Sequence, residues 1–116
     1  MTAMTPLIDA AASVRHAVLL TPGVADLSQS AAFQTCGPGR TVRGVALEAV
    51  PDGARVFVGV VIEDDDRPLT ALARSVRTAA EAAWARARVE DEAGAPVALE
   101  VTVHVVDMAE DGRSED

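Results

Sequence analysis

The stretch that decides the fold is ARVFVGVVIEDDDRPLTALARSVRTAAEAAW, residues 54–84, where an apolar run, four carboxylates and a proline precede a long amphipathic pattern. Apolar side chains alternate in its first part and predict a strand over residues 55–63. The alternating residues are Val56, Val58, Val60 and Ile62. In its second part apolar residues recur with the 3.6-residue period of a helix. They predict a helix from Pro68 to about Val89, with Leu72, Val76 and Trp84 on its buried face.

The four carboxylates at residues 63–66 lie between this strand and this helix. They suggest a metal site, half of an acid/base pair, or a junction between the two elements. A calcium loop needs oxygen ligands at alternating positions and a glycine bend, and this segment has neither. Carboxylates just before a helix interact favourably with its positive end, each by roughly 0.3–1 kcal/mol. We therefore interpret Asp64, Asp65 and Asp66 as the junction, with Pro68 at the first helical position, and predict no metal site.

Outward from this stretch the sequence predicts elements on both sides. These are a helix over residues 9–21 with Asp9 as its N-cap, a loop over 24–40, a strand over 41–50, a hairpin turn at 51–53 and a third strand over 97–107. The turn reads Pro-Asp-Gly, in which proline fixes one backbone angle and glycine supplies a positive φ. Gly94 and Pro96 are expected to end the long helix.

The order α-β-β-α-β predicts an α+β fold. We expect a two-layer sandwich with two helices on one face of a three-stranded mixed sheet. The strands at 55–63 and 97–107 are joined through the long helix, so they should be parallel with a right-handed connection. Residues 1–108 should form a single domain, and residues 109–116, AEDGRSED, an acidic disordered tail.

An interaction face follows from the second strand, which is apolar on both sides. Phe57 and Val61 alternate with the core residues, so they should point away from the helices. Val106 lies near them at the end of the third strand, and His104 lies on the polar side of that strand. A sheet covered on one side leaves its other face open. We therefore predict an interaction face made of Phe57, Val61, His104 and Val106.

The net charge of −8 argues against a nucleic-acid-binding domain and against direct adsorption to an anionic membrane, since both need a concentrated basic face. All ten basic residues are arginines, and they form no stripe in the sequence. No apolar run approaches the ~20 residues that span a bilayer. The N-terminus lacks the pattern of a signal peptide. A single cysteine, Cys36, excludes an intrachain disulfide and fits a reducing cytoplasm.

Few residues invite a catalytic interpretation. His104 is the most tempting general base, but no nucleophile is evident beside it, and His16 is interpreted as a surface residue. Cys36 lies near Arg40 without a protease or redox motif, and is read as an incidental thiol. We predict no catalytic residue, no cofactor and no metal. The alternative hypothesis is a small ligand-binding domain or enzyme that uses His104 and Glu100.

Five segments, in order, resemble the alkaline shock protein/Gls family, small envelope-stress proteins of Gram-positive bacteria, in their actinobacterial form. The segments are AVLLTPGVADLS (17–28), TCGPGRTVRGVAL (35–47), ARVFVGVVIE (54–63), RPLTALARSVRTAAEAAW (67–84) and VALEVTVHVVDM (97–108). The resemblance implies a cytoplasmic, non-enzymatic protein that supports cell-envelope homeostasis through protein–protein interaction. It implies attachment to the inner face of the membrane through an anchor protein, and it supplies no catalytic residues. Self-association, or docking to a partner, is expected from the open sheet face instead.

Overall fold

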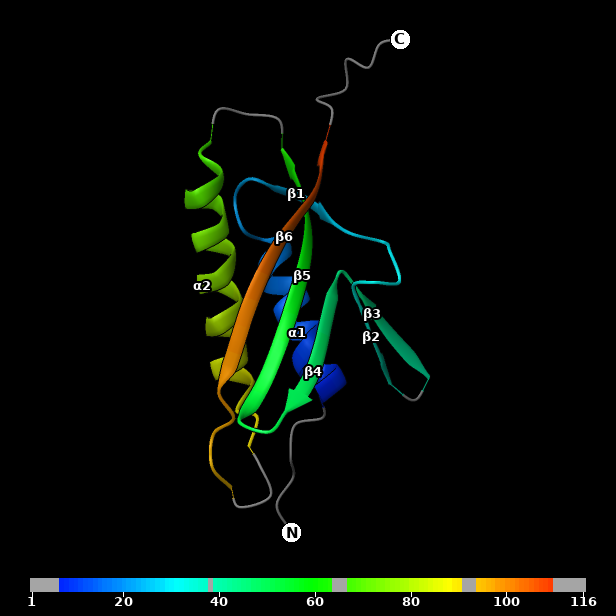
Figure 1. The fold of residues 1–116 in the computed structure, drawn as a ribbon, viewed down its shortest axis with the longest axis vertical. Coiled ribbons are helices and arrows are strands. Elements are labelled where there is room, and N and C mark those ends of the chain that lie inside the picture. Colours follow the sequence, from blue (N-terminus) through cyan, green and yellow to red (C-terminus); the bar gives the residue numbers. More distant parts are fainter. Residues whose placement is uncertain (1–6, 38, 64–66, 91–93, 110–116) are drawn as a thin grey trace.

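The computed structural model describes residues 7–37, 39–63, 67–90 and 94–109. Within them the chain is an α+β protein with two helices (Figure 1). In chain order the elements are α1 (Leu7–Leu19), β1 (Val24–Leu27), β2 (Gln34–Gly37), β3 (Arg40–Arg43), β4 (Val45–Val50), β5 (Gly53–Glu63), α2 (Leu69–Ala87) and β6 (Leu99–Ala109). Residues 64–66 of the acidic junction and residues 110–116 of the predicted tail lie outside the described residues. β6 reaches Ala109, one residue beyond the predicted domain boundary.

The main sheet is built around β5, which is its central strand. β1 and β4 both pair antiparallel with β5 along one edge, and β6 pairs with the other edge. This makes a four-stranded sheet, and β2 and β3 form a separate two-stranded sheet, so the prediction of three strands was wrong. The additional strands come from the segment predicted as a loop, since β1 and β2 both lie within residues 24–40.

Two predicted connections are confirmed. β5 and β6 are parallel, with Val56 paired to Val101 and Val58 to Val103, as a crossover through α2 requires. β4 and β5 form the antiparallel hairpin predicted around residues 51–53, with Val50 paired to Gly53. The long crossover and the tight turn together place β5 between its neighbours.

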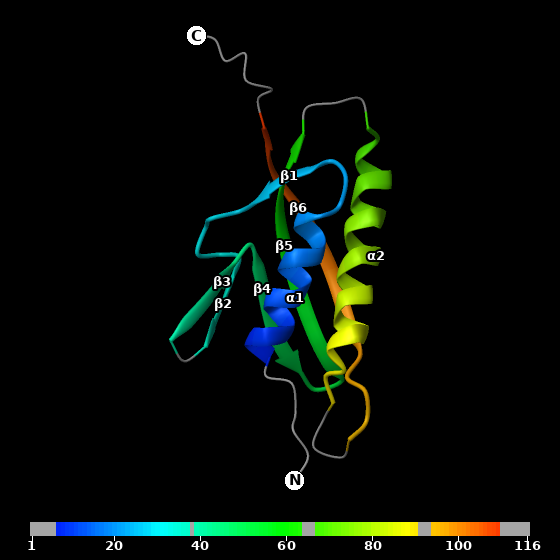
Figure 2. The same cartoon turned by 180° about the vertical axis from the view of Figure 1, so that it is seen from behind.

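Both helices lie on one side of the sheet. They are behind it in Figure 1 and in front of it in Figure 2. The buried residues of α1 are Ala10, Ala11, Val14 and Val18, and those of α2 are Leu72, Val76, Ala80, Ala83 and Trp84. They form one core with the alternating side chains of β5 that were predicted to be buried: Val56, Val58, Val60 and Ile62. The helical face predicted for α2 is therefore the packed face.

The helix ends differ in detail from the prediction. α1 begins two residues before Asp9, so Asp9 is not its N-cap. Its carboxylate instead pairs with Arg40 of β3 at 2.7 Å. Pro68 is the N-cap of α2 in an extended conformation (φ −62°, ψ 134°) rather than its first helical residue. α2 ends at Ala87 because Arg88 adopts a left-handed conformation (φ 55°), well before Gly94.

The strand predicted over residues 41–50 is broken at Gly44. Gly44 has φ +93°, which separates β3 from β4. A Cβ at this position would overlap the Cβ of Leu27, where β1 ends. The break follows from the buried residues Val42 and Val45, which are three positions apart and cannot share one face of a regular strand.

Candidate interaction surface

The outer face of the sheet, on the side away from the helices, carries the residues of β5 that alternate with the core. Phe57 and Val61 lie there, as predicted, but both side chains are half-buried rather than open to solvent. His104 of β6 is exposed and lies opposite Gly59 of β5 in the strand register. The structure thus brings Phe57, Val61 and His104 onto one face of two adjacent strands.

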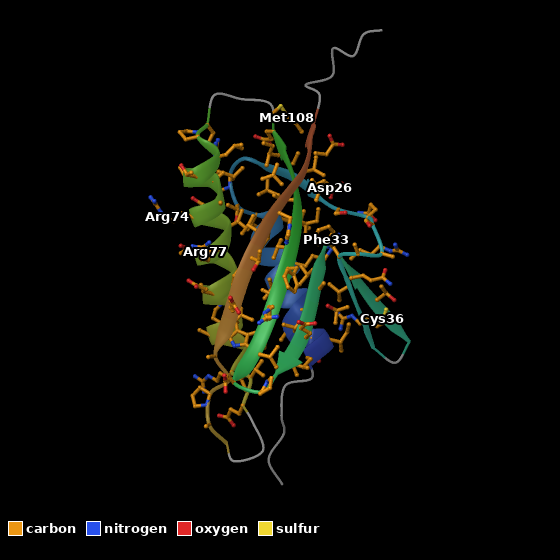
Figure 3. The ribbon with its side chains drawn as sticks, viewed as in Figure 1. Asp26, Phe33, Cys36, Arg74, Arg77 and Met108 are labelled. Atoms are coloured by element: carbon orange, nitrogen blue, oxygen red, sulfur yellow. The ribbon has the colours of Figure 1, made fainter. Side chains whose placement is uncertain are left out.

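Phe33 covers part of this face, and no role was predicted for it because it lies in the predicted loop. A Cβ placed on Gly59 would lie 2.9 Å from the Phe33 ring, so the aromatic ring packs directly on the glycine backbone. Figure 3 shows Phe33 lying over the central strands. The His104 imidazole contacts both phenyl rings, with ring centroids 5.3 Å from Phe33 and 5.9 Å from Phe57. These contacts explain why Phe57 is only half-exposed.

Backbone hydrogen bonds hold the segment that carries Phe33. Gly59 donates its N–H to the carbonyl of Gly44 (3.0 Å) and accepts from the N–H of Ser28 (2.8 Å). Gly44 donates to the carbonyl of Phe33 (2.6 Å). β5 therefore changes its partner from β4 to β1 at Gly59, and the connection between those partners carries Phe33 onto the outer face at the same point. The clue in the sequence was Phe33 itself, one of three aromatic residues in the chain.

The second part of the surface is the free edge of β6. Within the described residues β6 pairs with β5 alone, so its other edge is unpaired. The register shifts near its end, where Val60 pairs with Val105 and Val61 with Asp107. Val106, between them, is the extra residue of a bulge.

Three apolar side chains of β6 are exposed at and beyond this bulge. Val105 is 44% exposed, Val106 42% and Met108 50%. Val106 is thus the member of the predicted interaction face that is most clearly apolar and accessible. Val105 and Met108 were missed because alternation assigned Val105 to the core side, and a bulge is not visible in the sequence pattern.

The residues of the alternative, catalytic interpretation are not brought together. Glu100 and His104 are four residues apart on β6, which corresponds to about 13 Å along a strand. Glu100 accepts a hydrogen bond from Nε of Arg55 (3.2 Å), and Arg55 also lies 3.6 Å from Glu48. His104 instead contacts the rings of Phe33 and Phe57. A general acid and base must reach the same reacting group, which this separation does not favour.

The other singled-out residues lie apart from this surface. Cys36 is exposed on β2 (Figure 3), where its only described polar contacts are long ones from Gln34 (3.6 Å) and Thr41 (3.9 Å) to Sγ. His16 is exposed on α1. Across the part of the chain that the structure describes, no three His, Cys, Asp or Glu side chains are grouped as a metal ion would require.

Neither described helix is both long enough and apolar enough to cross a membrane. Comparisons of the chain with protein-family models, with curated proteins and with solved structures found no match.

Proposed function

We propose that this protein is a non-catalytic interaction module that supports cell-envelope homeostasis by binding other proteins. The observation that carries the proposal is the unpaired outer edge of β6, flanked by exposed Val105, Val106 and Met108. An edge strand offers a row of unpaired N–H and C=O groups to another chain. Such an edge is commonly used for binding through strand addition, in which main-chain hydrogen bonds supply affinity and side-chain pockets supply specificity.

The sequence of β6 suits this use. Soluble proteins often protect an edge strand with lysine or proline, and residues 99–109 contain neither. The bulge at Val106 limits regular pairing to the stretch before it. The proposal takes the fold as two layers in which both helices cover one face of the sheet. The partner would then contact the β6 edge and the outer face beside it, including Phe57 and His104.

We take a second copy of this chain as the first partner. The same edge on two copies can pair around a two-fold axis, which is the commonest symmetry of homo-oligomers. The cellular role is drawn from the resemblance of residues 17–108 to alkaline shock proteins. In this view the protein acts in the cytoplasm and is held at the inner face of the membrane by an anchor protein. Its net charge of −8 supports a protein anchor over direct binding to anionic lipid.

Light scattering coupled to size exclusion tests the self-association. The wild type should elute with the mass of an oligomer, whereas Val106→Lys, which places a charge at the β6 edge, should elute as a folded monomer. Leu20→Lys is the matched control, because Leu20 is 70% exposed but lies at the end of α1. The control should keep the oligomeric mass. A monomeric wild type at about 100 µM, where a standard-size interface would be populated, would contradict self-association.

Phe57→Glu examines the outer face in the same experiment. The substitution should disrupt assembly while circular dichroism stays that of the native fold, since the side chain is half-buried rather than part of the core. Unfolding of this variant would mean that Phe57, which contacts His104, is part of the internal packing and is not a contact with a partner.

A further inference from the structure

Arginines far apart in the sequence meet in a depression between α1 and β3. The depression has a volume of about 420 Å³. Its polar lining consists of Arg15, His16, Gln29, Arg40, Thr41 and Arg43. Among the residues that the structure describes, no acidic side chain lines it. A cluster of three guanidinium groups is notable in a chain with eighteen acidic residues and a net charge of −8.

Two of these arginines form no ion pair. Arg40 is paired with Asp9 at 2.7 Å, but Arg15 and Arg43 have no carboxylate partner among the described residues. Like charges held close together repel one another, and the repulsion grows where water is partly excluded. Here Arg15 and Arg43 line one depression without a carboxylate partner among the described residues, although acidic side chains are abundant elsewhere. An anionic ligand would relieve this repulsion.

One hydrogen bond to a backbone carbonyl orients each of the two guanidinium groups. Arg15 donates from Nε to the backbone carbonyl of Arg43 (3.0 Å), and Arg43 donates from Nη1 to the carbonyl of Gln29 (3.2 Å). Arg15 is also half-buried, which restricts its side chain further. Its two terminal amino groups make no hydrogen bond to another described residue. The donors are therefore positioned before a ligand arrives, which lowers the entropy lost on binding.

We propose that this depression binds the phosphate group of a small phosphorylated ligand. Arginine pairs with phosphate through two parallel hydrogen bonds, and a phosphate offers more charge and more acceptor oxygens than a carboxylate. Arg15 and Arg43 would bind these oxygens directly, and the Thr41 hydroxyl would exchange its long contact to Cys36 Sγ (3.9 Å) for one of them. Because the protein as a whole is acidic, binding depends on these local groups and not on general attraction.

A second depression provides room for the remainder of the ligand. It has a volume of about 470 Å³, lies between α1 and α2, and shares Ala12, His16 and Arg40 with the first. Arg86 of α2 lines it as well, so the basic character continues across α1. Asp9 is the acidic residue in its lining, and it is already paired with Arg40.

Calorimetric titration with inorganic pyrophosphate at low ionic strength tests the site. We expect saturable binding that weakens about tenfold or more in Arg15→Gln/Arg43→Gln, as the loss of charge-assisted hydrogen bonds predicts. Arg74→Gln/Arg77→Gln is the matched control. It removes the same charge from α2, where Figure 3 shows both side chains projecting away from the sheet. The control should change the affinity by no more than about twofold, as expected for screened charges.

Three results would overturn the proposal: no binding at millimolar pyrophosphate, equal losses in both double variants, or equally tight binding of a dicarboxylate such as malonate. If Arg15→Gln/Arg43→Gln does not fold by circular dichroism, Arg15→Lys/Arg43→Lys replaces it. This variant keeps the charges but loses the planar fork, so pyrophosphate affinity should still fall several-fold. Unchanged affinity in this variant would also reject direct binding by the two arginines.

Vesicles distinguish the two sources of the phosphate. Phosphatidylcholine vesicles with and without phosphatidylglycerol are mixed with the wild type and separated by flotation. Co-flotation that requires phosphatidylglycerol and both arginines, and that pyrophosphate inhibits, identifies a lipid headgroup. Pyrophosphate binding without co-flotation identifies a soluble phosphate ester. The proposal is independent of the β6 edge, so the mass measurements on Val106→Lys do not bear on it.

Discussion

The indole N–H of Trp84 donates a 2.7 Å hydrogen bond to the backbone carbonyl of Val97, two residues before β6 begins. The Trp84 side chain is otherwise in the core, with 6% of its surface exposed. Val97 also donates its N–H to the carbonyl of Val89 (3.0 Å), just beyond the end of α2. These two bonds fasten the returning chain to the end of α2, and so set where β6 starts along β5.

Trp84→Phe should lower the free energy of unfolding by about 1–2 kcal/mol. Phenylalanine keeps an aromatic ring but leaves the Val97 carbonyl without its donor. Trp84→Ala should cost more, about 3–5 kcal/mol, because a cavity is added. Urea unfolding followed by circular dichroism measures both, since neither variant retains the fluorophore. Equal costs for the two substitutions would mean that the hydrogen bond, and not the packing of the ring, is what Trp84 contributes.

Leu72→Ala and Arg74→Ala compare the two faces of α2. Leu72 is 3% exposed within the core, so its truncation should cost about 2–5 kcal/mol. Arg74 is exposed and makes no described ion pair, so its loss should cost less than about 0.5 kcal/mol. Denaturant melts on the two variants should therefore differ clearly in midpoint. Similar midpoints would reject the packing of α2 on the sheet.

Gly44→Ala should be strongly destabilising, by about 2 kcal/mol or more. The substitution adds the strain of a positive φ to a clash with Leu27. Gly39→Ala is the matched control, because Gly39 also has a positive φ (+69°) but has nothing within 4 Å of an added Cβ. Gly39→Ala should lower the free energy of unfolding only by the backbone strain of an alanine at positive φ, about 1–2 kcal/mol. Thermal unfolding separates the two effects. Equal losses would show that β1 can move away from Gly44.

Arg88→Gly should raise the stability by about 0.5–1 kcal/mol. Arg88 is the one described non-glycine residue with positive φ, and it ends α2 in the left-handed conformation that glycine adopts without steric cost. Part of the gain is offset by the larger entropy of glycine in the unfolded chain. Arg86→Gly, two residues earlier and inside the helix, should instead destabilise by about 1 kcal/mol. A loss of stability in Arg88→Gly would mean that the contacts of the arginine side chain stabilise the fold by more than its left-handed backbone conformation destabilises it.

The elements with strong periodicity were predictable from the sequence, and those defined by a few backbone contacts were not. α2, β5 and the parallel pairing of β6 follow from long apolar patterns and from the crossover rule. β1 has only four residues, and the middle two are exposed, so no pattern distinguishes it from a loop. The spacing of Val42 and Val45 could have revealed the break at Gly44. In a regular strand residues three positions apart point to opposite faces, yet both valines are buried.

The candidate surfaces were likewise predictable only where a periodic pattern defines them. Alternation placed Phe57 and Val61 on the outer face, but it could not indicate that Phe33, 24 or more residues earlier, would pack over Gly59 beside them. The depression at Arg15 and Arg43 was equally hidden, since these residues are 28 positions apart and meet only when α1 packs beside β3. Contacts between distant segments depend on the chain path across the sheet, which local patterns do not encode.

The central position of β5 has a consequence for the order in which the protein can assemble during synthesis. The hairpin of β4 and β5 forms from neighbouring residues and can close early. The other edge of β5 must wait for β6, whose first residue, Leu99, pairs with Ala54, 45 positions before it. A ribosome-bound chain therefore presents an open, strongly apolar strand until β6 emerges. In this interval the nascent protein is most exposed to mispairing with other chains and to capture by chaperones.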